Sequence, residues 1–261
     1  MLDYTERPPS IRALKRHFLD RNRRAFRPET LSCAAHLILN LDDSREMLRL
    51  GLQHMVSQLG ASRADAGVLT PVDPVYAPQE FYYNEAVEAP NCDGVAYSNR
   101  AAALRTAWAR PKPVFCTNVR DTPLFQDSMG EFERIQTTSI VFQQLTLGRR
   151  PVGISCIDYV REEHEWKSGE LEFVHGFCTE FLGPLIGIHE YWNEDSGNTL
   201  RKPTESELDA IRLAAEGLSC KEIARQLGKS YRTIENQLRN ARLMLDAKTL
   251  PELIKKCEIW F

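Results

Sequence analysis

The clearest periodic pattern of apolar residues lies in the last sixty or so positions of the chain. Four apolar side chains recur there at steps of four, three and four, which places them on one face of a helix. They are Ile234, Leu238, Ala241 and Leu245. A shorter apolar segment precedes them and ends at Gly228, the residue type best suited to the left-handed turn that closes a helix. The pattern predicts two short helices joined by a tight turn.

Polar residues mark where these helices begin. Thr204 with Glu207, and Ser219 with Glu222, have the spacing of a capping box, in which each side chain bonds a free amide of the first turn. Ser230 stands where an N-cap of the next helix is expected. With one more apolar helix at the C-terminal end, these signals predict a separate all-α domain of four helices.

The first two hundred residues combine helical and strand-like periods. Residues 137–159 are the strongest strand pair, because the β-branched runs TTSIVFQQLTL and VGISCIDYV flank a GRRP turn. The other expected elements are helices over 11–26, 44–59 and 98–109, a strand over 63–69 and an aromatic segment over 81–83. An antiparallel sheet flanked by helices, in the α+β class, follows from this order.

A long helix is predicted over 166–192, with Ser168 as its N-cap and a local bend at Pro184. Its apolar residues alternate at steps of three and four, as in a coiled-coil seam. They are Leu171, Val174, Cys178, Phe181, Leu185, Ile188 and Trp192. Either this seam pairs with a second copy of the chain, or the helix packs on its own sheet. The additional apolar residues Phe173 and Phe177 favour the second interpretation.

Composition narrows the class of protein only a little. The 261 residues are 43% apolar and 26% charged, as in a globular protein of one or two domains. The net charge is −3, yet residues 200–261 carry +3, so the rest of the chain carries −6. A mildly basic tail on an acidic body is compatible with a DNA-binding domain attached to another module.

Membrane, export and metal signals are not found in the sequence. There is no apolar run of eighteen residues, and the N-terminus lacks the apolar core of a signal peptide. The seven cysteines form no CxxC pair, so reduced thiols in the cytoplasm are expected. His175 and Cys178 lie three residues apart without a second pair, so neither a metal site nor a cofactor is predicted.

The helix that follows Ser230 carries the candidate DNA-binding chemistry. An α-helix fits the major groove, where Arg can pair with guanine and Asn with adenine. The face opposite the apolar residues presents Tyr231, Arg232, Glu235, Asn236, Arg239 and Arg242. The alternative is a small helical bundle whose polar face is merely hydrated.

Residues 216–245 closely resemble the LuxR-type helix-turn-helix family. The family pattern is met at Gly217, Ser219, Lys221, Glu222, Ile223, Ala224, Leu227, Gly228, Ser230, Thr233, Ile234 and Leu238. The resemblance implies that Lys221 and Thr233 contact phosphates and that the last helix, 250–259, pairs DNA-binding domains. It also implies that base edges are reached by Glu235, Asn236 and Arg239.

Two positions depart from that family pattern. Gln237 stands where a His is frequent, and Asp246 stands where a Gly often ends the helix. Neither changes the expected fold, but the first leaves the operator sequence open.

Three kinds of sensor commonly precede such a module. A phosphoacceptor receiver is excluded, because after Asp42-Asp43 no apolar strand ending in Asp follows at the required interval. An acyl-homoserine-lactone binding domain remains an alternative, since Asp73-Pro74-Val75 resembles part of its motif. The Trp and Tyr that should precede that motif are absent.

The third kind is a GAF-like domain, which residues 42–190 resemble in the order of their elements. Ser139, Gly148, Gly153, Ser168 and Leu171 fit the hairpin and helix start of that family. The resemblance implies a cavity for a small molecule over one face of the sheet. The expected cavity residues are Tyr83, Tyr97, Trp108, Cys116, Asn118, Phe125, Phe142 and Gln144.

An aromatic wall with a few amides suits a flat organic effector. Two questions stay open at the level of the sequence. Either Phe142 and Gln144 or Val141 and Gln143 face the cavity, because strand residues alternate between faces. For any single aromatic residue, the simpler interpretation is ordinary core.

An enzyme is the less favoured interpretation. Some GAF-like domains reduce methionine sulfoxide, which needs an attacking and a resolving thiol side by side. Cys116 and Cys156 would have to meet by an accident of the fold, so we expect no enzyme. A cysteine-based redox-sensing regulator remains an alternative.

The sequence thus predicts a DNA-binding transcription regulator in four parts. These are a helical extension over 1–41, a GAF-like sensor domain over 42–192, a linker over 193–203 and a helix-turn-helix domain over 204–261. The expected partners are promoter DNA, a small organic effector, RNA polymerase and a second copy of the chain.

Overall fold

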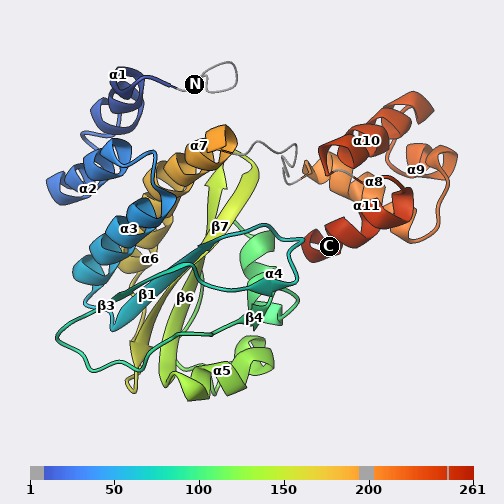
Figure 1. The fold of residues 1–261 in the computed structure, drawn as a ribbon. Helices are drawn as coiled ribbons and strands as arrows, with labels where there is room; N and C mark the ends of the chain where they lie inside the picture. Colours follow the sequence, from blue (N-terminus) through green and yellow to red (C-terminus); the bar gives the residue numbers. More distant parts are fainter. Residues whose placement is uncertain (1–8, 194–202, 246) are drawn as a thin grey trace.

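The computed structural model describes residues 9–193, 203–245 and 247–261. Over these ranges the chain forms a sheet with helices on both faces, followed by a bundle of short helices (Figure 1). The predicted α+β class with a C-terminal all-α region is confirmed. The expected linker over 193–203 lies almost wholly outside the described residues, as does the start of the extension over 1–41.

Five antiparallel strands form the main sheet, in the order β3-β1-β7-β6-β5. Their bounds are β1 (Arg63–Val68), β3 (Glu80–Tyr83), β5 (Val114–Cys116), β6 (Thr137–Leu147) and β7 (Arg150–Val160). β6 and β7 are the predicted hairpin, and Gly148 turns between them with a φ of 61°. A second, two-stranded sheet of β2 (Val75–Tyr76) and β4 (Tyr97–Ser98) was not predicted by the sequence pattern.

One face of the main sheet is covered by helices from both ends of this part of the chain (Figure 1). They are α2 (Pro28–Leu39), α3 (Ser44–Leu59), α6 (Ser168–Phe177), the π-helical segment η3 (Cys178–Leu182) and α7 (Gly183–Asn193). α3 has the predicted bounds and ends at Gly60, whose φ is 66°. The helix predicted over 11–26 is shorter: α1 (Ile11–Leu14) continues into π-helical η1 (Lys15–Asp20), and a turn follows.

The apolar seam of the long helix lies inside this core. Val174, Cys178, Phe181 and Leu185 are completely buried, and α7 packs against α3, β6 and β7. The helix therefore packs on its own sheet, and the seam is not available to a second copy of the chain. The π-helical segment η3 ends two residues before Pro184, a residue that has no amide to donate to the helix.

The predicted N-cap of this helix is wrong by one residue. Lys167 is the N-cap, and its backbone amide donates to Glu170 Oε2 at 2.8 Å. Ser168 lies within the first turn, where its hydroxyl donates to Glu172 Oε1 at 2.9 Å. The carboxylate of Glu170 thus satisfies the free backbone amide of Lys167 at the start of the helix.

The helical run Ser168–Trp192 is long and apolar enough, by length and composition, to cross a membrane. Its apolar window has a mean hydropathy of 1.2 and is 56% buried. The core helix of a soluble domain passes the same test, and here the apolar side chains pack on the sheet.

The opposite face of the sheet is covered by α4 (Ala102–Ala109), the 3-10 helix η2 (Pro123–Ser128), α5 (Met129–Arg134) and the loops around β2 and β4 (Figure 1). Phe142 of β6 packs in this second core, whereas Val141 packs in the first. This settles the register that the sequence left open: Phe142 and Gln144 face α4, and Gln143 faces His175 of α6.

The C-terminal part contains α8 (Glu205–Ala215), α9 (Cys220–Gln226), α10 (Tyr231–Met244), α11 (Leu250–Cys257) and the 3-10 helix η4 (Glu258–Trp260). The capping boxes at Thr204 and Ser219 are present, and Gly228 has a φ of 62°. The four periodic residues, three in α10 and Leu245 directly after it, are all buried in a separate core. These local predictions are confirmed.

Within the described residues, the two parts of the chain touch through η4, through Val72 and at the tip of the central hairpin. η4 lies against α4, and Val72 packs against the C-terminal core. At the tip of the central hairpin, Arg149 Nη2 donates to the carbonyl of Pro203 at 3.2 Å.

Candidate nucleic-acid interface and sensor cluster

The position of α10 is fixed by the core beneath it. Ile234 is completely buried and Leu238 nearly so, and both pack with Ile223 of α9 and Leu208 of α8. Because these side chains hold one face of α10 inward, its opposite face lies on the surface. The left-handed turn at Gly228 brings α9 against α10 across a loop of only a few residues.

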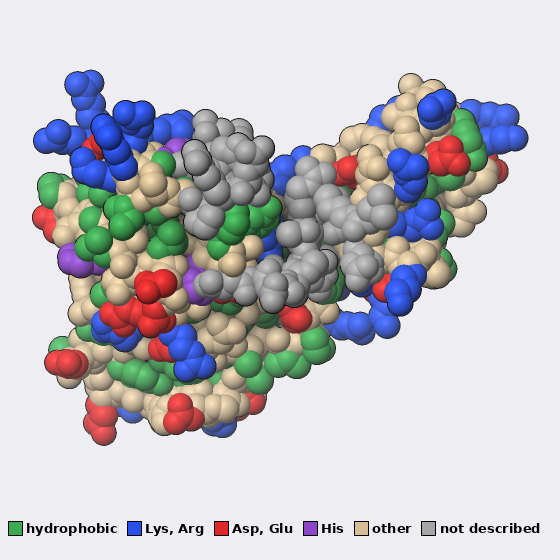
Figure 2. Space-filling model, turned by 45° about the horizontal axis from the view of Figure 1, so that its top comes forward, with side chains coloured by type: hydrophobic (Ala, Val, Ile, Leu, Met, Phe, Trp, Pro, Cys, Tyr) green, Lys and Arg blue, Asp and Glu red, His purple; other side chains and the backbone are tan. Residues whose placement is uncertain are grey.

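An open groove of about 700 Å³ runs along this exposed face. All six side chains predicted for it line the groove, namely Tyr231, Arg232, Glu235, Asn236, Arg239 and Arg242. Leu238, Leu250 and Cys220 of α9 complete the lining. In Figure 2, Lys and Arg side chains are distributed over this part of the surface. The groove thus combines guanidinium donors with an amide that can both donate and accept.

The remaining predicted DNA-binding residues lie at the edges of this face. Lys221 is exposed on α9. Ser230 is the N-cap of α10, because its Oγ accepts from the amide of Thr233 at 3.0 Å. The two hydroxyls of Ser230 and Thr233 also lie 2.7 Å apart, and both are exposed. The helix start therefore presents polar groups beside the groove.

Gln237 does not belong to the exposed face. Its Nε2 donates to the hydroxyl of Ser206 on α8 at 2.7 Å, and Lys229 Nζ donates to the same oxygen. Gln237, where the sequence departs from the family pattern, thus links α10 to α8 through this hydrogen bond. It leaves the groove side chains unchanged.

On the other side of the molecule, five of the eight predicted cavity residues meet in one buried cluster beneath α4. They are Tyr97, Trp108, Cys116, Phe125 and Phe142, each at most 5% exposed. Phe125 stacks on Phe142 with ring centroids 5.8 Å apart. Gln144 lies beside them and donates to the carbonyl of Trp108 at 3.3 Å. These side chains fill the space over the sheet, so a ligand would have to displace some of them.

Of the other two predicted cavity residues, Tyr83 packs against the edge of the cluster and Asn118 lies outside it. Asn118 donates to Glu163 Oε1 at 2.8 Å on the surface, outside the cluster. Tyr83 is half-buried on edge strand β3, and its hydroxyl accepts from the amide of Cys92 at 3.0 Å. Asn118 follows the end of β5, where the chain has already left the sheet, and its side chain therefore lies outside the cluster.

The sequence interpretation missed a buried polar group within this cluster. Asp65 of β1 accepts a hydrogen bond from the hydroxyl of Tyr76, and Cys156 Sγ lies 3.6 Å from the same hydroxyl. Burial raises the pKa of Asp65 to about 7, although the bond from Tyr76 opposes this shift. The sequence signal was the charged pair Arg63 and Asp65 within a short strand.

Arg63 forms a second buried polar contact on the same strand face. Its guanidinium donates to Asp158 of β7 at 2.9 and 2.7 Å, and to the carbonyls of Pro90 and Ile135. Both charged side chains are at most 6% exposed. This ion pair joins the sheet to the loops that cover it.

The seven cysteines are all unpaired. Burial raises the pKa of Cys116 to about 12 and the pKa of Cys156 well above its ordinary value. Both thiols are therefore held in the protonated, poorly nucleophilic form. Among the described residues, no group of three His, Cys, Asp or Glu side chains is placed to hold a metal ion.

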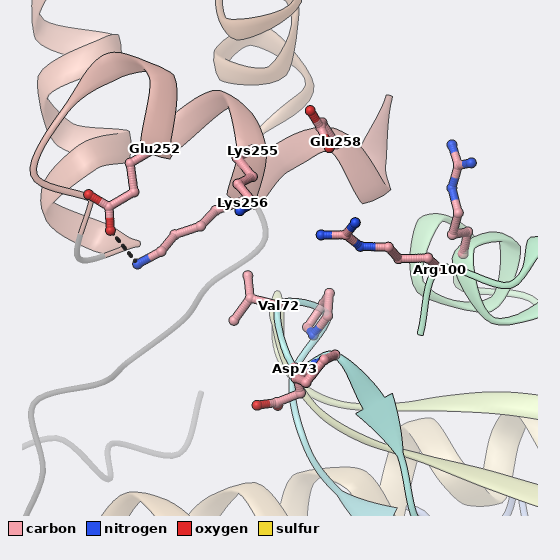
Figure 3. Close-up of a pocket in the computed structure, with 10 residues that line it drawn as sticks. Val72, Asp73, Arg100, Glu252, Lys255, Lys256 and Glu258 are labelled. Atoms are coloured by element: carbon pink, nitrogen blue, oxygen red, sulfur yellow. Dashed lines mark ion pairs between the residues drawn. The ribbon is translucent and has the colours of Figure 1, made fainter. Parts of the chain in front are cut away.

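A pocket of about 600 Å³ opens where the two parts of the chain meet (Figure 3). Charges of both signs line it, with Arg100 and Asp73 on one side and Lys255, Lys256 and Glu258 on the other. Asp73 Oδ2 accepts from the amide and hydroxyl of Thr70. The Asp73-Pro74-Val75 segment therefore borders this pocket, and Asp73 and Pro74 line it, instead of the aromatic cluster.

Comparison with known proteins bears on both parts. Residues 207–242 match the family model of the homeodomain-like domain. No curated protein matches the chain.

Solved structures resemble the first part. One is a methyl-accepting chemotaxis protein, residues 122 to 287, with 13% identity, a TM-score of 0.50, and coverage of 62% of this chain and 99% of that one. Another is JSC1_58120g3 with bound biliverdin, with 12% identity, a TM-score of 0.50, and coverage of 61% and 99%. The PixJ GAF domain of Thermosynechococcus elongatus has 11% identity and a TM-score of 0.49, over 57% and 88%.

Together with the strand order, these findings define the fold. The N-terminal part is a GAF-like antiparallel sheet with helices, and the C-terminal part contains a homeodomain-like helix-turn-helix. At such low identity, the structural resemblance establishes the fold alone.

Proposed function

We propose that the chain is a LuxR-type transcription regulator that inserts α10 into the major groove of promoter DNA and senses a small organic molecule through its GAF-like part. The observation that carries the proposal is the exposed face of α10, where all six predicted side chains line one groove. Arg239 offers two parallel donors that suit guanine, and Asn236 offers a donor and an acceptor that suit adenine. Lys221 lies to one side, where it can contact a phosphate.

Two substitutions test the base-reading role. The full chain is used to select a preferred sequence from a random pool of duplexes. Arg239→Ala should weaken binding to that sequence by roughly 1–3 kcal/mol relative to a scrambled duplex. Lys221→Ala should weaken binding to both duplexes about equally. Arg110→Ala, an exposed change on the sheet-bearing part, should behave like the parent. Unchanged discrimination by Arg239→Ala would disprove the assignment.

The aromatic cluster is the proposed effector site. Its rings offer a flat apolar surface, and Asp65, Tyr76 and Gln144 offer a few polar groups beside it. Native mass spectrometry of the purified protein tests this proposal, since a retained small molecule would appear as added mass. Phe142→Ala should abolish that added mass, whereas Asn118→Ala, outside the cluster, should retain it.

Two alternatives have less support. An acyl-homoserine-lactone site would use Asp73, which instead bonds Thr70 in its own loop. A redox sensor or a thiol-dependent reductase would need a thiolate, and burial opposes ionisation of both Cys116 and Cys156. For the same reason we infer that the chain is a regulator and not an enzyme.

The proposed mechanism needs a homodimer, because two α10 helices must match half-sites about one helical turn apart. Since the long-helix seam is buried, α11 is the remaining surface proposed for pairing. An effector can change the arrangement only through its different affinity for the two states. A monomer in sedimentation at micromolar concentration, with and without DNA, would disprove this scheme.

A further inference from the structure

The first helical segment presents a strongly basic surface that the proposed function does not use. Six cationic side chains of α1, η1 and the turn after them are exposed, and we call them the N-terminal basic surface: Arg12, Lys15, Arg16, Arg21, Arg23 and Arg24. Within the part of the chain that the structure describes, Lys15 pairs with Asp20 at 3.6 Å. In Figure 2, Lys and Arg side chains gather at the end of the molecule that carries α1.

The direction of these cations is set by packing. Leu14 is completely buried and Phe18 is 3% exposed, and both belong to the same core as α2 and α3. Ser10 caps α1 through its hydroxyl, which accepts from the amide of Ala13 at 3.2 Å. With one face of the segment anchored inward, the charged residues at neighbouring helical positions must lie on the outer surface.

The N-terminal basic surface lies on the same side of the molecule as α10. Figure 1 shows α1 and α10 at the two ends of its upper side, and Figure 2, which turns that side forward, shows basic side chains at both ends. The net charge of the whole chain is −3, so this local excess of positive charge has the opposite sign to the net charge of the chain. A polyanion long enough to span the distance from α1 to α10 would therefore contact cationic side chains at both.

We propose that the N-terminal basic surface binds phosphates of the same DNA duplex that α10 enters, outside the footprint of the helix-turn-helix. The inference rests on the proposed function and extends it. DNA is favoured over a lipid surface, because a membrane-bound helix needs exposed apolar side chains beside its charges. Here the apolar side chains of Leu14 and Phe18 are buried in the core. Within α1, Ile11 is the one large apolar side chain that is exposed.

Salt dependence provides the test, because each phosphate neutralised releases counterions, and the slope of log K against log salt is about −0.9 per contact. The variant Arg12→Gln/Arg16→Gln/Arg23→Gln removes three exposed charges. The matched control, Arg110→Gln/Lys112→Gln/Arg120→Gln, removes three exposed charges around β5, on the far face of the sheet. Fluorescence anisotropy with the full chain measures binding to duplexes of arbitrary sequence, of about 40 and about 16 base pairs.

The basic-surface variant should bind the longer duplex at least about ten-fold more weakly at low salt, with a slope reduced in magnitude by about 2 to 3. On the shorter duplex it should match the parent, since that duplex cannot extend beyond the helix-turn-helix. The control should match the parent on both, and circular dichroism should show the same thermal midpoint for all three proteins. This pattern supports the proposal.

Other outcomes overturn the inference in distinguishable ways. If the parent binds DNA and Lys221→Ala weakens it, but the basic-surface variant keeps the full slope, the inference fails and the proposed function stands. If the parent binds no duplex, both fail. If the slope is unchanged and the substitutions instead abolish sedimentation with phosphatidylserine vesicles, the surface binds lipid and the inference is wrong.

Discussion

Arg63 and Asp158 form the most deeply buried ion pair among the described residues. The guanidinium is satisfied by Asp158, by Thr137 and by the carbonyls of Pro90 and Ile135. Replacing Arg63 with Met would leave the Asp158 carboxylate buried without a countercharge, with the hydroxyl of Thr137 still donating to it. We expect a loss of about 3–5 kcal/mol in the free energy of unfolding, measured by urea denaturation.

A double replacement provides the control for this prediction. Arg63→Met/Asp158→Leu removes both charges and should recover part of the loss, because no isolated charge then remains. If the single variant unfolds at the same urea concentration as the parent, the pair contributes nothing to stability. A double variant less stable than the single one would show that the contacts with the loop carbonyls dominate.

Asp65 should make the stability of the protein depend on pH. Its pKa is raised to about 7 by burial, while the carboxyl of an unfolded chain ionises near pH 4. The folded state therefore holds a proton that the unfolded state releases, so the contribution of Asp65 to stability is greatest below about pH 4 and is lost as pH rises to about 7. Asp65→Asn removes this term and should raise the thermal midpoint at pH 8.

The same substitution should flatten the profile of thermal midpoint against pH between about 4 and 7. Asp121→Asn, an exposed change, serves as the control and should follow the parent profile. If the profile of thermal midpoint against pH is the same for Asp65→Asn as for the parent, the Asp65 carboxyl does not titrate in the folded protein over that range.

These buried charges explain what the sequence did not predict at the residue scale. In β1, Arg63 and Asp65 alternate with Ala64 and Ala66, a pattern typical of a strand with one hydrated face. The structure instead buries both faces, because the long loop after β1 folds back and Pro90 meets the guanidinium. Such coverage depends on contacts between distant segments, which periodicity does not contain.

At the scale of elements, close packing of the long helix on β6 depends on Gly183. A Cβ at this position would lie 2.6 Å from the amide nitrogen of Thr146 and 2.8 Å from the carbonyl oxygen of Cys178. Gly183→Ala should therefore push α7 off the sheet and lower the free energy of unfolding by about 1–3 kcal/mol. Chemical denaturation of the purified protein measures this change.

Gly169 supplies the matched control in the same helical run. A Cβ there meets no atom within 4 Å, so Gly169→Ala should be neutral or stabilise by up to about 1 kcal/mol. Equal effects of the two substitutions would mean that helix propensity, and not the contact with Thr146, determines the result.

Elements defined by local signals were predicted well. The capping boxes at Thr204 and Ser219, the end of α3 at Gly60 and the turn at Gly148 each depend on a few neighbouring residues. The pairing of β2 with β4 was missed because each strand has two residues and their partners are far apart in the sequence. Likewise, the DNA-binding groove lies on one predicted helix, whereas the aromatic cluster draws on several distant segments.

The whole molecule contains separate cores, and this should be visible in unfolding. The helical part has its own core, built from side chains of α8, α9, α10 and α11, whereas the sheet has one core on each face. Because few contacts join the parts, calorimetry should show two transitions. A fragment of residues 203–261 should fold alone, with a midpoint close to one of them. A single transition and an unstructured fragment would contradict this prediction.

The central hairpin connects the aromatic cluster to the start of the C-terminal part. Five residue steps along β6 separate Phe142, which stacks on Phe125, from Leu147 at the turn. Just beyond, in the turn, Arg149 donates to the carbonyl of Pro203. At about 3.3 Å per residue this stretch of β6 is about 17 Å long, so a tilt of about 5° at Phe142 moves its end by about 1.5 Å. That displacement breaks a hydrogen bond of 3.2 Å. Rotation of the Phe142 ring to admit an effector would then release Pro203, which lies just before α8, without any change in the helix-turn-helix itself.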